Sequence, residues 1–408
     1  MIGAPDPLAL DGAVLVLPDR LAAGRVVLDG ELIGAIEAVP IDAVSWADSA
    51  AVVGAAATGA AATRMAATGS PGRDGCDYLI PGLIELHTDN LEHHLMPRPK
   101  VSFPTVPALL AHDAQIAAAG ITTVCDALGV GDPYGDGFRA RDQSALLAAL
   151  AALHEAQLLR ADHHLHVRCE LPAPNARELF EPFVDHPRLR LISLMDHTPG
   201  QRQWLDLAHA ETYYTGKKGW TREQFADEVA RAPERQRRYA EPHRRHFADY
   251  ARSTGIRLAT HDDTTSAHVA EARALGATIS EFPTTLEAAR HARAAGLATV
   301  AGAPNVVRGG SHSGNVSAAA LARAGLLDVL SSDYVPASLI AAAWLLHRND
   351  GLPLPAAVAT VTANAADVLG FADRGRLVPG LRADLVRVRV IDGRPVVLAV
   401  WVAGRRVH

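Results

Sequence analysis

Short apolar runs separated by turns mark both ends of the chain. They fill residues 9–37 and 383–407, and the longest run is Val396–Val402. Runs of this length bounded by turn residues predict small antiparallel strands. We therefore expect the termini, residues 1–77 and 366–408, to form one small β-sandwich domain together.

The middle of the chain, residues 78–365, repeats a different pattern, in which a strand-length apolar run is followed by a helix-like segment. The expected strands are Tyr78–His87, Ile121–Ala127, Leu165–Leu171, Leu189–His197, Ile256–His261, Thr278–Phe282, Leu297–Ala303 and Leu327–Asp333. The helical patterns between them include Ser144–Leu159, Ser266–Leu275, Leu286–Ala295 and Ser317–Ala324. Runs that are apolar on both faces and alternate with amphipathic helices are typical of parallel βα units. About eight such units predict an α/β fold, a (β/α)8 TIM-like barrel.

Two segments depart from these patterns. Residues 41–75 are rich in Ala, Gly and Thr and poor in large apolar side chains, which predicts a flexible insertion. Residues 211–250 are too long and too charged for a simple βα loop. We expect inserted helices over the barrel mouth there.

Polar side chains gather where the expected barrel strands end, which is where barrel enzymes carry their catalytic groups. These residues are His87, Asp89, Glu170, Asp196, His197, His261, Asp262, Asp263, Glu281 and Asp333. Any one of them alone is better explained structurally, and Asp262 or Asp263 would serve as a helix cap. Because several strands contribute, coincidence is a poor explanation of the whole set. Clustered carboxylates repel one another unless a cation lies among them, so one or two divalent metal ions are expected. Imidazole with carboxylate favours zinc, with manganese or iron as alternatives.

Composition narrows the class of protein. The 408 residues are 49% hydrophobic and 21% charged, which is typical of a globular chain. A formal net charge of -6 offers no basic field, so nucleic acid and anionic membranes are not expected partners. The 3 cysteines form no CxxC pair, which excludes a disulfide scaffold and a thiolate zinc site. With no signal-peptide pattern at the start, the sequence predicts a cytoplasmic protein and leaves a homo-oligomer open.

Two stretches resemble the amidohydrolase superfamily. Pro81–His87 is similar to its first barrel strand, and Asn364–Val386 is similar to the passage that leads back to its β-sandwich. Two departures are informative. The first strand has His87-x-Asp89 where most members have His-x-His, and none of the 3 lysines ends an expected strand. A carboxylated lysine that bridges two metals is therefore unavailable, and Glu170 is the natural substitute.

Longer motifs resemble one branch, the phosphonate-metabolism protein M family. They are His87–Glu92 with Pro97–Pro99, Ser193–Gln201, His261–Thr264, Ser280–Thr285, Gly302–Asn315 and Ser331–Tyr334. The resemblance implies hydrolysis of α-D-ribose 1-methylphosphonate 5-triphosphate to the 5-phosphate and pyrophosphate, within the carbon–phosphorus lyase pathway. It implies metal ligation by His87, Asp89, Glu170, His197, His261 and Asp333. Glu170 would bridge two ions, and Asp333 would orient the attacking water and take its proton.

A triphosphorylated sugar phosphonate requires cations and backbone donors around its phosphates. The glycine-rich loop Arg308–Asn315, expected to lead into a helix N-terminus, is the main candidate. The expected substrate-binding residues are Arg98, Gln201, Arg202, Lys217, Lys218, Asn305, Arg308, Ser311, His312 and Asn315. A solvated turn explains Lys217 and Lys218 equally well, and a rigid loop is the alternative for Arg98. We expect the metal ligands to be held in place by a second layer of carboxylates, those of Asp196, Asp262, Asp263 and Glu281.

Two other functions stay open at this point. One is an amidohydrolase that cleaves an amide or imide, or deaminates a small ring, for which the glycine-rich loop would be less needed. The other is a barrel kept as a non-catalytic scaffold, whose mark would be lost metal ligands, whereas this chain retains a full set.

Overall fold

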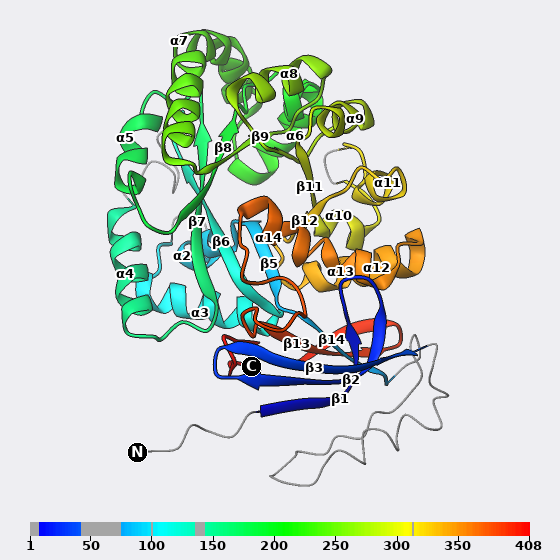
Figure 1. The fold of residues 1–408 in the computed structure, drawn as a ribbon. Helices are drawn as coiled ribbons and strands as arrows, with labels where there is room; N and C mark the ends of the chain where they lie inside the picture. Colours follow the sequence, from blue (N-terminus) through cyan, green and yellow to red (C-terminus); the bar gives the residue numbers. More distant parts are fainter. Residues whose placement is uncertain (1–7, 42–74, 99–100, 135–142, 312–313) are drawn as a thin grey trace.

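The computed structural model describes residues 8–41, 75–98, 101–134, 143–311 and 314–408. These residues form a parallel barrel with helices around it and a separate β-sheet at its base (Figure 1). Apart from its ends, the expected insertion at 41–75 lies outside the described residues. The domain boundaries at 77/78 and 365/366 stay a prediction.

The barrel consists of eight strands that pair in parallel in the order of the sequence. They are β5 (Leu83–Thr88), β6 (Ile121–Val130), β7 (Asp162–Glu170), β8 (Leu189–Met195), β9 (Arg257–His261), β10 (Ile279–Glu281), β11 (Ala298–Gly302) and β12 (Val329–Ser331). The last strand returns to the first through a parallel bridge between Thr88 and Asp333, and the Asp333 N–H donates to the His87 carbonyl at 3.2 Å. The predicted barrel is therefore confirmed. It closes beside His87 and Asp333, which are both candidate site residues.

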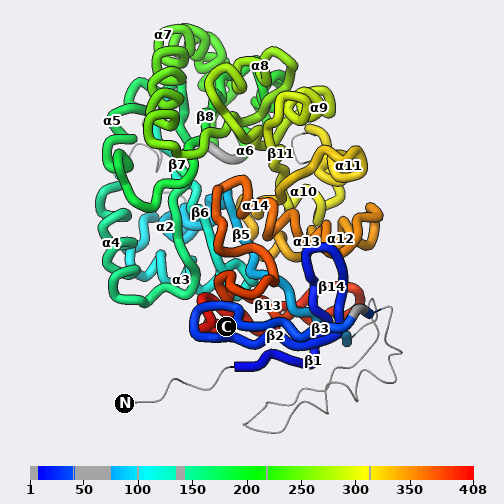
Figure 2. The backbone as a smooth tube through the Cα atoms, in the orientation of Figure 1, coloured from blue at the N-terminus to red at the C-terminus, as the bar shows by residue number. Residues whose placement is uncertain are grey.

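Helices lie outside the barrel, as the alternating pattern predicts (Figure 2). They are α2 (Asn90–Leu95), α3 (Thr105–Ala118), α4 (Ser144–Glu155), α5 (Ala176–Phe180), α6 (Leu207–Lys218), α7 (Arg222–Thr254), α8 (Ser266–Leu275), α9 (Leu286–Ala294), α10 (Ala303–Arg308), α11 (Ala318–Arg323), α12 (Ser338–Asp350), α13 (Leu354–Ala359) and α14 (Ala363–Leu369). Short 3₁₀ turns occur at Glu181–Phe183 and Arg202–Trp204. Within the described ranges, no helix combines the length and the apolar character that crossing a bilayer requires.

Both ends of the chain build the terminal sheet, as expected. Its strands are β1 (Leu8–Val16), β2 (Leu21–Asp29), β3 (Leu32–Pro40), β4 (Asp77–Pro81), β13 (Leu385–Ile391), β14 (Arg394–Val402) and β15 (Arg405–Arg406). All are linked by hydrogen bonds into one sheet of order β15-β14-β13-β4-β1-β2-β3. The C-terminal strands thus lie beside β4 and the N-terminal strands (Figure 1).

The run Tyr78–His87 differs from the expected single strand. It divides at Gly82 into β4 of the terminal sheet and β5 of the barrel. A Cβ at Gly82 would lie 2.1 Å from the Thr122 hydroxyl oxygen, so the backbone passes β6 at a distance that only glycine allows. The reason is tertiary contact, which the apolar pattern of the run does not encode.

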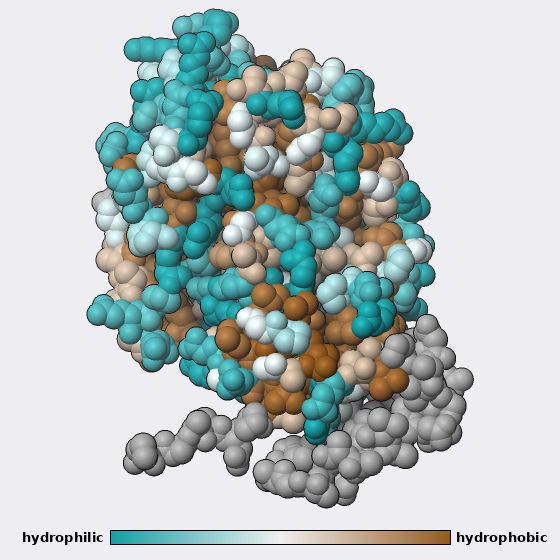
Figure 3. Space-filling view, viewed as in Figure 1, coloured by the Kyte–Doolittle hydropathy of each residue, from teal (hydrophilic) through white to brown (hydrophobic). Residues whose placement is uncertain are grey.

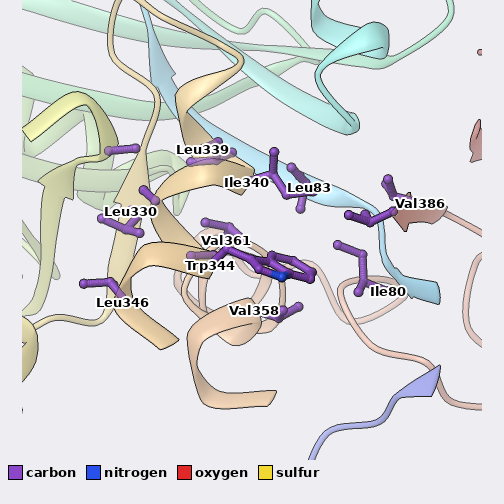
Figure 4. Packing of buried hydrophobic residues seen from close by; sticks show 14 of the residues in the cluster. Ile80, Leu83, Leu330, Leu339, Ile340, Trp344, Leu346, Val358, Val361 and Val386 are labelled. Atoms are coloured by element: carbon purple, nitrogen blue, oxygen red, sulfur yellow. The ribbon is translucent and has the colours of Figure 1, made fainter. Parts of the chain in front are cut away.

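The core joins the two parts of the molecule. Leu83 and Leu330 of the barrel pack with Trp344 of α12, and Ile80 and Val386 of the terminal sheet belong to the same cluster (Figure 4). A Trp ring with apolar residues on several sides is a large source of hydrophobic stabilisation. The cluster therefore fixes the terminal sheet against one end of the barrel.

Helices α6 and α7 are the expected insertion. Helix α7 begins with a capping box, in which the Thr221 side chain accepts from the Gln224 N–H and the Gln224 side chain accepts from the Thr221 N–H. Near its other end, Phe247, Ala248 and Ala251 are buried in the core beside β8 and β9. Its outer face carries hydrophilic side chains, which gather at the upper left of the molecule in Figure 3.

Candidate metal centre and substrate cavity

A cavity of about 690 Å³ opens at the ends of the barrel strands. All six expected metal ligands are among the residues that line it: His87, Asp89, Glu170, His197, His261 and Asp333. They come from strands β5, β7, β8, β9 and β12 or from the residues directly after them. The fold thus brings together the groups that the strand-end pattern singled out.

Three of the strands end in an unusual backbone conformation. Asp262 after β9, Phe282 after β10 and Asp333 after β12 have φ values of 58°, 53° and 54°. Residues other than glycine adopt this left-handed region at a cost of about 1–3 kcal/mol, and they do so mostly at functional sites. All three line the cavity. The backbone there is shaped to present these side chains rather than to continue the strands.

One group of donor atoms comes from His197, His261 and Asp262, whose ligand atoms all lie within 4.8 Å of one another. The His261 Nδ1 is 2.8 Å from Asp262 Oδ2, and the His197 Nδ1 is 2.5 Å from Glu170 Oε2. Burial alone would lower the pKa of His261, but the Asp262 carboxylate, its hydrogen bond and Glu281 raise it on balance. Carboxylates at the Nδ1 atoms orient both rings, as partners of metal-binding histidines commonly do.

A second group of donor atoms consists of His87, His166 and Glu281, all buried. The His87 Nδ1 is 3.0 Å from Glu281 Oε1, and the His87 and His166 rings meet edge to face with 4.8 Å between centroids. Burial, Arg168 and His261 together lower the pKa of His87 well below its usual value. The imidazole is therefore neutral, which is the form that binds a metal ion.

Arg168 and His166 were not among the expected site residues. Arg168 lines the cavity with its Nη1 3.7 Å from Asp89 Oδ2 and its Nη2 3.3 Å from Glu92 Oε1. His166, Arg168 and Glu170 are successive alternate residues of β7. Since every second side chain of a strand points to the same face, this alternation is the signal that identifies them.

The residues present fit a divalent metal ion. Asp89 Oδ1 is buried and finds no hydrogen-bond partner among the described residues, an arrangement that is costly unless a ligand completes it. The described residues that line the cavity include six carboxylates, those of Asp89, Glu92, Asp132, Glu170, Asp262 and Asp333, against the three guanidinium groups of Arg168, Arg235 and Arg308. Nitrogen and oxygen donors with this excess of negative charge suit a divalent cation.

Four of the expected substrate-binding residues line the cavity: Asn305, Arg308, Ser311 and Asn315. The glycine-rich segment differs from expectation in one respect, because it follows the C-terminus of α10 instead of leading directly into a helix. The next helix, α11, begins only after Ser317, which accepts from the Ala320 N–H, while Asn305 Oδ1 accepts from the Ala318 N–H. Protein groups thus already satisfy these N–H groups of α11, which leaves the side chains and the loop as donors.

Other expected residues lie elsewhere. Arg202 ion-pairs with Asp263 at 2.9 Å and with Glu271 at 3.5 Å, so its charge is taken up by carboxylates. Asp196 accepts from Thr198 and Gln236. The following are absent from the described residues that line the cavity: Arg98, Asp196, Gln201, Arg202, Asp263 and Glu281. Asp196, Asp263 and Glu281 are buried, which agrees with a supporting role.

Three expected residues cannot be placed. Lys217 and Lys218 end α6, but their side chains lie outside the described part, and His312 lies outside the described residues. Their contact with a substrate stays a prediction.

The sequence reasoning also missed a wall of the cavity formed by Tyr134, Trp204, Tyr213, Tyr214 and Arg235, which we call the aromatic wall. The Tyr134 and Tyr214 hydroxyls are 3.3 Å apart, and the Arg235 guanidinium lies 5.6 Å from the Tyr134 ring centre. Burial is the main cause that raises the pKa of both tyrosines above the usual range, so both stay neutral. Their convergence depends on how α6 and α7 fold over the barrel.

Comparison with known proteins gives the family. The amidohydrolase family matches residues 212–408. The alpha-D-ribose 1-methylphosphonate 5-triphosphate diphosphatase of Escherichia coli strain K12 is 46% identical over 332 residues, which cover 81% of this chain and 88% of that protein.

Solved structures agree on the fold. Dihydropyrimidinase from Brevibacillus agri superimposes with a TM-score of 0.59 at 13% identity, over 98% of this chain and 95% of its own. N-acetylglucosamine-6-phosphate deacetylase from Pasteurella multocida gives a TM-score of 0.55 at 13% identity, over 98% and 99%. At this level of identity the likeness concerns the fold alone.

Proposed function

The chain belongs to the amidohydrolase family, in the branch of the alpha-D-ribose 1-methylphosphonate 5-triphosphate diphosphatases, and from this premise we propose that it hydrolyses that sugar triphosphate to the 5-phosphate and pyrophosphate in phosphonate catabolism. The observation that carries the proposal is the cavity at the strand ends, where the candidate metal ligands and three guanidinium groups line the same space. A phosphoanhydride needs both, because catalysis of its cleavage is mostly positioning and charge neutralisation.

Members of this family depend on a metal, and we propose His87, Asp89, Glu170, His197, His261 and Asp333 as the ligands of one or two divalent ions. Zinc is the favoured metal from the nitrogen and oxygen donors, with manganese and iron as alternatives. If two ions bind, Glu170 is the proposed shared ligand. A divalent ion there would supply positive charge to the phosphoryl oxygens and make the attacking water more acidic.

The residues of the chain would then do the remaining work. Asp333 is proposed to hold the attacking water at its carboxylate and to accept its proton. Its left-handed backbone and the bridge to Thr88 fix where that carboxylate can lie. Arg308, Ser311 and Asn315, which end α10 or follow it, are proposed to donate hydrogen bonds to phosphate oxygens. The non-catalytic scaffold is disfavoured because the full set of candidate ligands converges on the cavity.

We further propose that the protein acts in the cytoplasm on a small molecule, with neither nucleic acid nor a membrane as partner. Its three cysteines are all buried and unpaired, which suits a reducing compartment. Of the open alternatives, hydrolysis of an amide or imide is the one that an assay must distinguish from hydrolysis of the triphosphate.

The product assay tests the function. Purified, metal-loaded protein is incubated with α-D-ribose 1-methylphosphonate 5-triphosphate, and pyrophosphate and orthophosphate are measured separately. Pyrophosphate is the expected product. Release of orthophosphate alone, or of no phosphate product, would contradict the proposal, and only the second outcome would leave the amide-hydrolase alternative open.

The variant Asp333→Asn tests the mechanism. Removing the proton acceptor should lower kcat by about 100-fold or more while the metal stays bound, as measured by elemental analysis and steady-state kinetics. Asp392→Asn is the matched control, because Asp392 is exposed in the β13–β14 turn and has a similar φ of 50°. Full turnover in Asp333→Asn would remove this residue from the mechanism.

A further inference from the structure

Buried hydrogen-bond donors without acceptors gather on one side of the barrel mouth. Within the described part of the chain, the side-chain atoms Gln201 Nε2, Trp204 Nε1 and Arg235 Nε are buried and have no hydrogen-bond partner. Leaving a buried donor unpaired is costly, and native proteins rarely carry several close together. An arrangement of this kind suggests that an acceptor-rich ligand completes it.

The three donors come from two segments that touch each other. Gln201 and Trp204 lie in one tight turn, where the Trp204 N–H donates to the Gln201 carbonyl at 2.9 Å. Gln236, the neighbour of Arg235 on α7, donates to Gln201 Oε1 at 3.0 Å. The amide oxygen of Gln201 is thereby engaged, and its nitrogen is left as a donor.

The aromatic wall holds this group rigid. The Trp204 ring lies 4.8 Å from that of Tyr213 and 5.8 Å from that of Tyr214, measured between centroids. Trp204 is only 4% exposed, yet it lines the cavity together with Arg235. A buried indole N–H that stands on a cavity wall normally finds an acceptor.

Arg235 can offer further N–H donors to an anion. Among the residues that the structure describes, its guanidinium pairs with one carboxylate, that of Glu228, which is itself 92% buried and shares the helix. The planar fork of an arginine offers five N–H groups, so this pair leaves donors unused. Other arginines of α7, such as Arg237, are exposed and pair with neighbours on the surface.

We propose that Trp204 and Arg235 form an anion subsite on the cavity wall that binds a tetrahedral phosphoryl or phosphonyl group of the substrate, and that Gln201, which lies behind the lining, supports it through its contact with Gln236. The inference rests on the proposed function and extends it, since it assigns the inserted helices α6 and α7 a part in substrate recognition. A substrate with a triphosphate at one end and a methylphosphonate at the other has two sources of such a group. Either end supplies the same tetrahedral array of acceptor oxygens.

The experiment measures binding of two probes, inorganic pyrophosphate and methylphosphonate, to the metal-loaded full-length protein by calorimetry. The variants are Arg235→Gln, which removes the charge, and Trp204→Phe, which removes the indole N–H and keeps an aromatic ring. Arg237→Gln is the matched control on the same helix. Arg235→Lys preserves the charge beside Glu228 and separates loss of binding from loss of folding, which thermal unfolding monitors.

Wild type should bind at least one probe. Since a hydrogen bond to a charged group contributes about 1.5–3 kcal/mol, Arg235→Gln should weaken that binding about tenfold or more. Trp204→Phe should weaken it by a smaller factor, and Arg237→Gln should not change it. A loss of binding confined to pyrophosphate assigns the subsite to the triphosphate end of the substrate. A loss confined to methylphosphonate assigns it to the methylphosphonate end.

Absence of binding in wild type, or equal binding by wild type and both folded variants, would overturn the subsite. These outcomes are distinct from failure of the proposed function, because the probes are bound without turnover. Pyrophosphate release from the triphosphate, measured as above, decides the reaction by itself.

Discussion

Glu281 controls how His87 faces the cavity. The carboxylate is fully buried, lies 3.0 Å from His87 Nδ1 and also accepts a hydrogen bond from the Ser193 hydroxyl. A carboxylate at Nδ1 keeps the proton on that nitrogen and leaves Nε2 free to bind a metal ion. If His87 binds the metal as proposed, Glu281 would act on it through His87 and would be a positioning residue.

The variant Glu281→Gln should weaken metal binding about tenfold or more, because an amide holds the imidazole less firmly than a carboxylate. A metal titration in competition with a chromophoric chelator measures this directly, without an activity assay. Glu287→Gln is the control, since Glu287 is two-thirds exposed on α9. Equal affinities for the metal in both variants would show that Glu281 has no such role.

At the scale of elements, the apolar pattern predicted all eight barrel strands, and the candidate ligands lie within two residues of their ends. The pattern is informative there because parallel strands buried on both faces carry long apolar runs. It failed at Gly82, where one run serves two sheets. The position of that break depends on the close contact between Gly82 and Thr122, two segments distant in sequence.

The candidate site divides in the same way. Residues at strand ends, such as His197 and His261, could be predicted because the barrel topology itself brings them together. His166 lies four residues before Glu170 and was recoverable from strand alternation. Trp204 and Arg235 could not be predicted in this way. Their position on the cavity wall depends on how α7 packs against the barrel, and no local sequence pattern indicates it.

Strands β6 and β7 and helix α3 share a buried ionic network away from the cavity. His163 lies between two carboxylates, with Nδ1 2.8 Å from Asp126 and Nε2 3.3 Å from Asp113. Asp126 also accepts from His112 at 2.7 Å, and Asp113 pairs with Arg160. Burial opposes a charge on His163, but the two carboxylates raise its pKa to about 10.

This network predicts a pH-dependent difference in stability between wild type and His163→Gln. The folded pKa of His163 lies above the unfolded value of about 6.5, so its ionic contribution is complete below pH 6.5 and is lost as the pH rises towards 10. The gap in Tm between the two proteins should therefore be largest near pH 6 and shrink up to pH 10. Differential scanning calorimetry across this range checks the trend, and a gap that stays constant or widens would refute it.

At the scale of the whole molecule, Asp162 links the barrel to the segment that leads into the terminal sheet. It stands at the start of β7, at the end of the barrel opposite the cavity. Its carboxylate contacts Arg374 at 2.8 Å, Arg188 at 3.0 Å and Arg382 at 3.4 Å. Arg374 is only 5% exposed, so its charge depends on this partner and on Asp373. One carboxylate thus serves cations from two parts of the chain.

Asp162→Asn should lower the free energy of unfolding by about 1.5–3 kcal/mol, because it removes the charged acceptor that the buried Arg374 shares with the partly buried Arg188 and Arg382, while Arg374 keeps Asp373 as its other partner. Denaturant titration measures the loss, and metal content should be unchanged, since the residue lies away from the cavity. Asp367→Asn is the matched control. Its pair with Arg376 is largely exposed, and removing a surface ion pair costs less than about 1 kcal/mol. Should the two variants lose equal stability, the terminal sheet would be held by the apolar core around Trp344 alone, and the charges at Asp162 would contribute little.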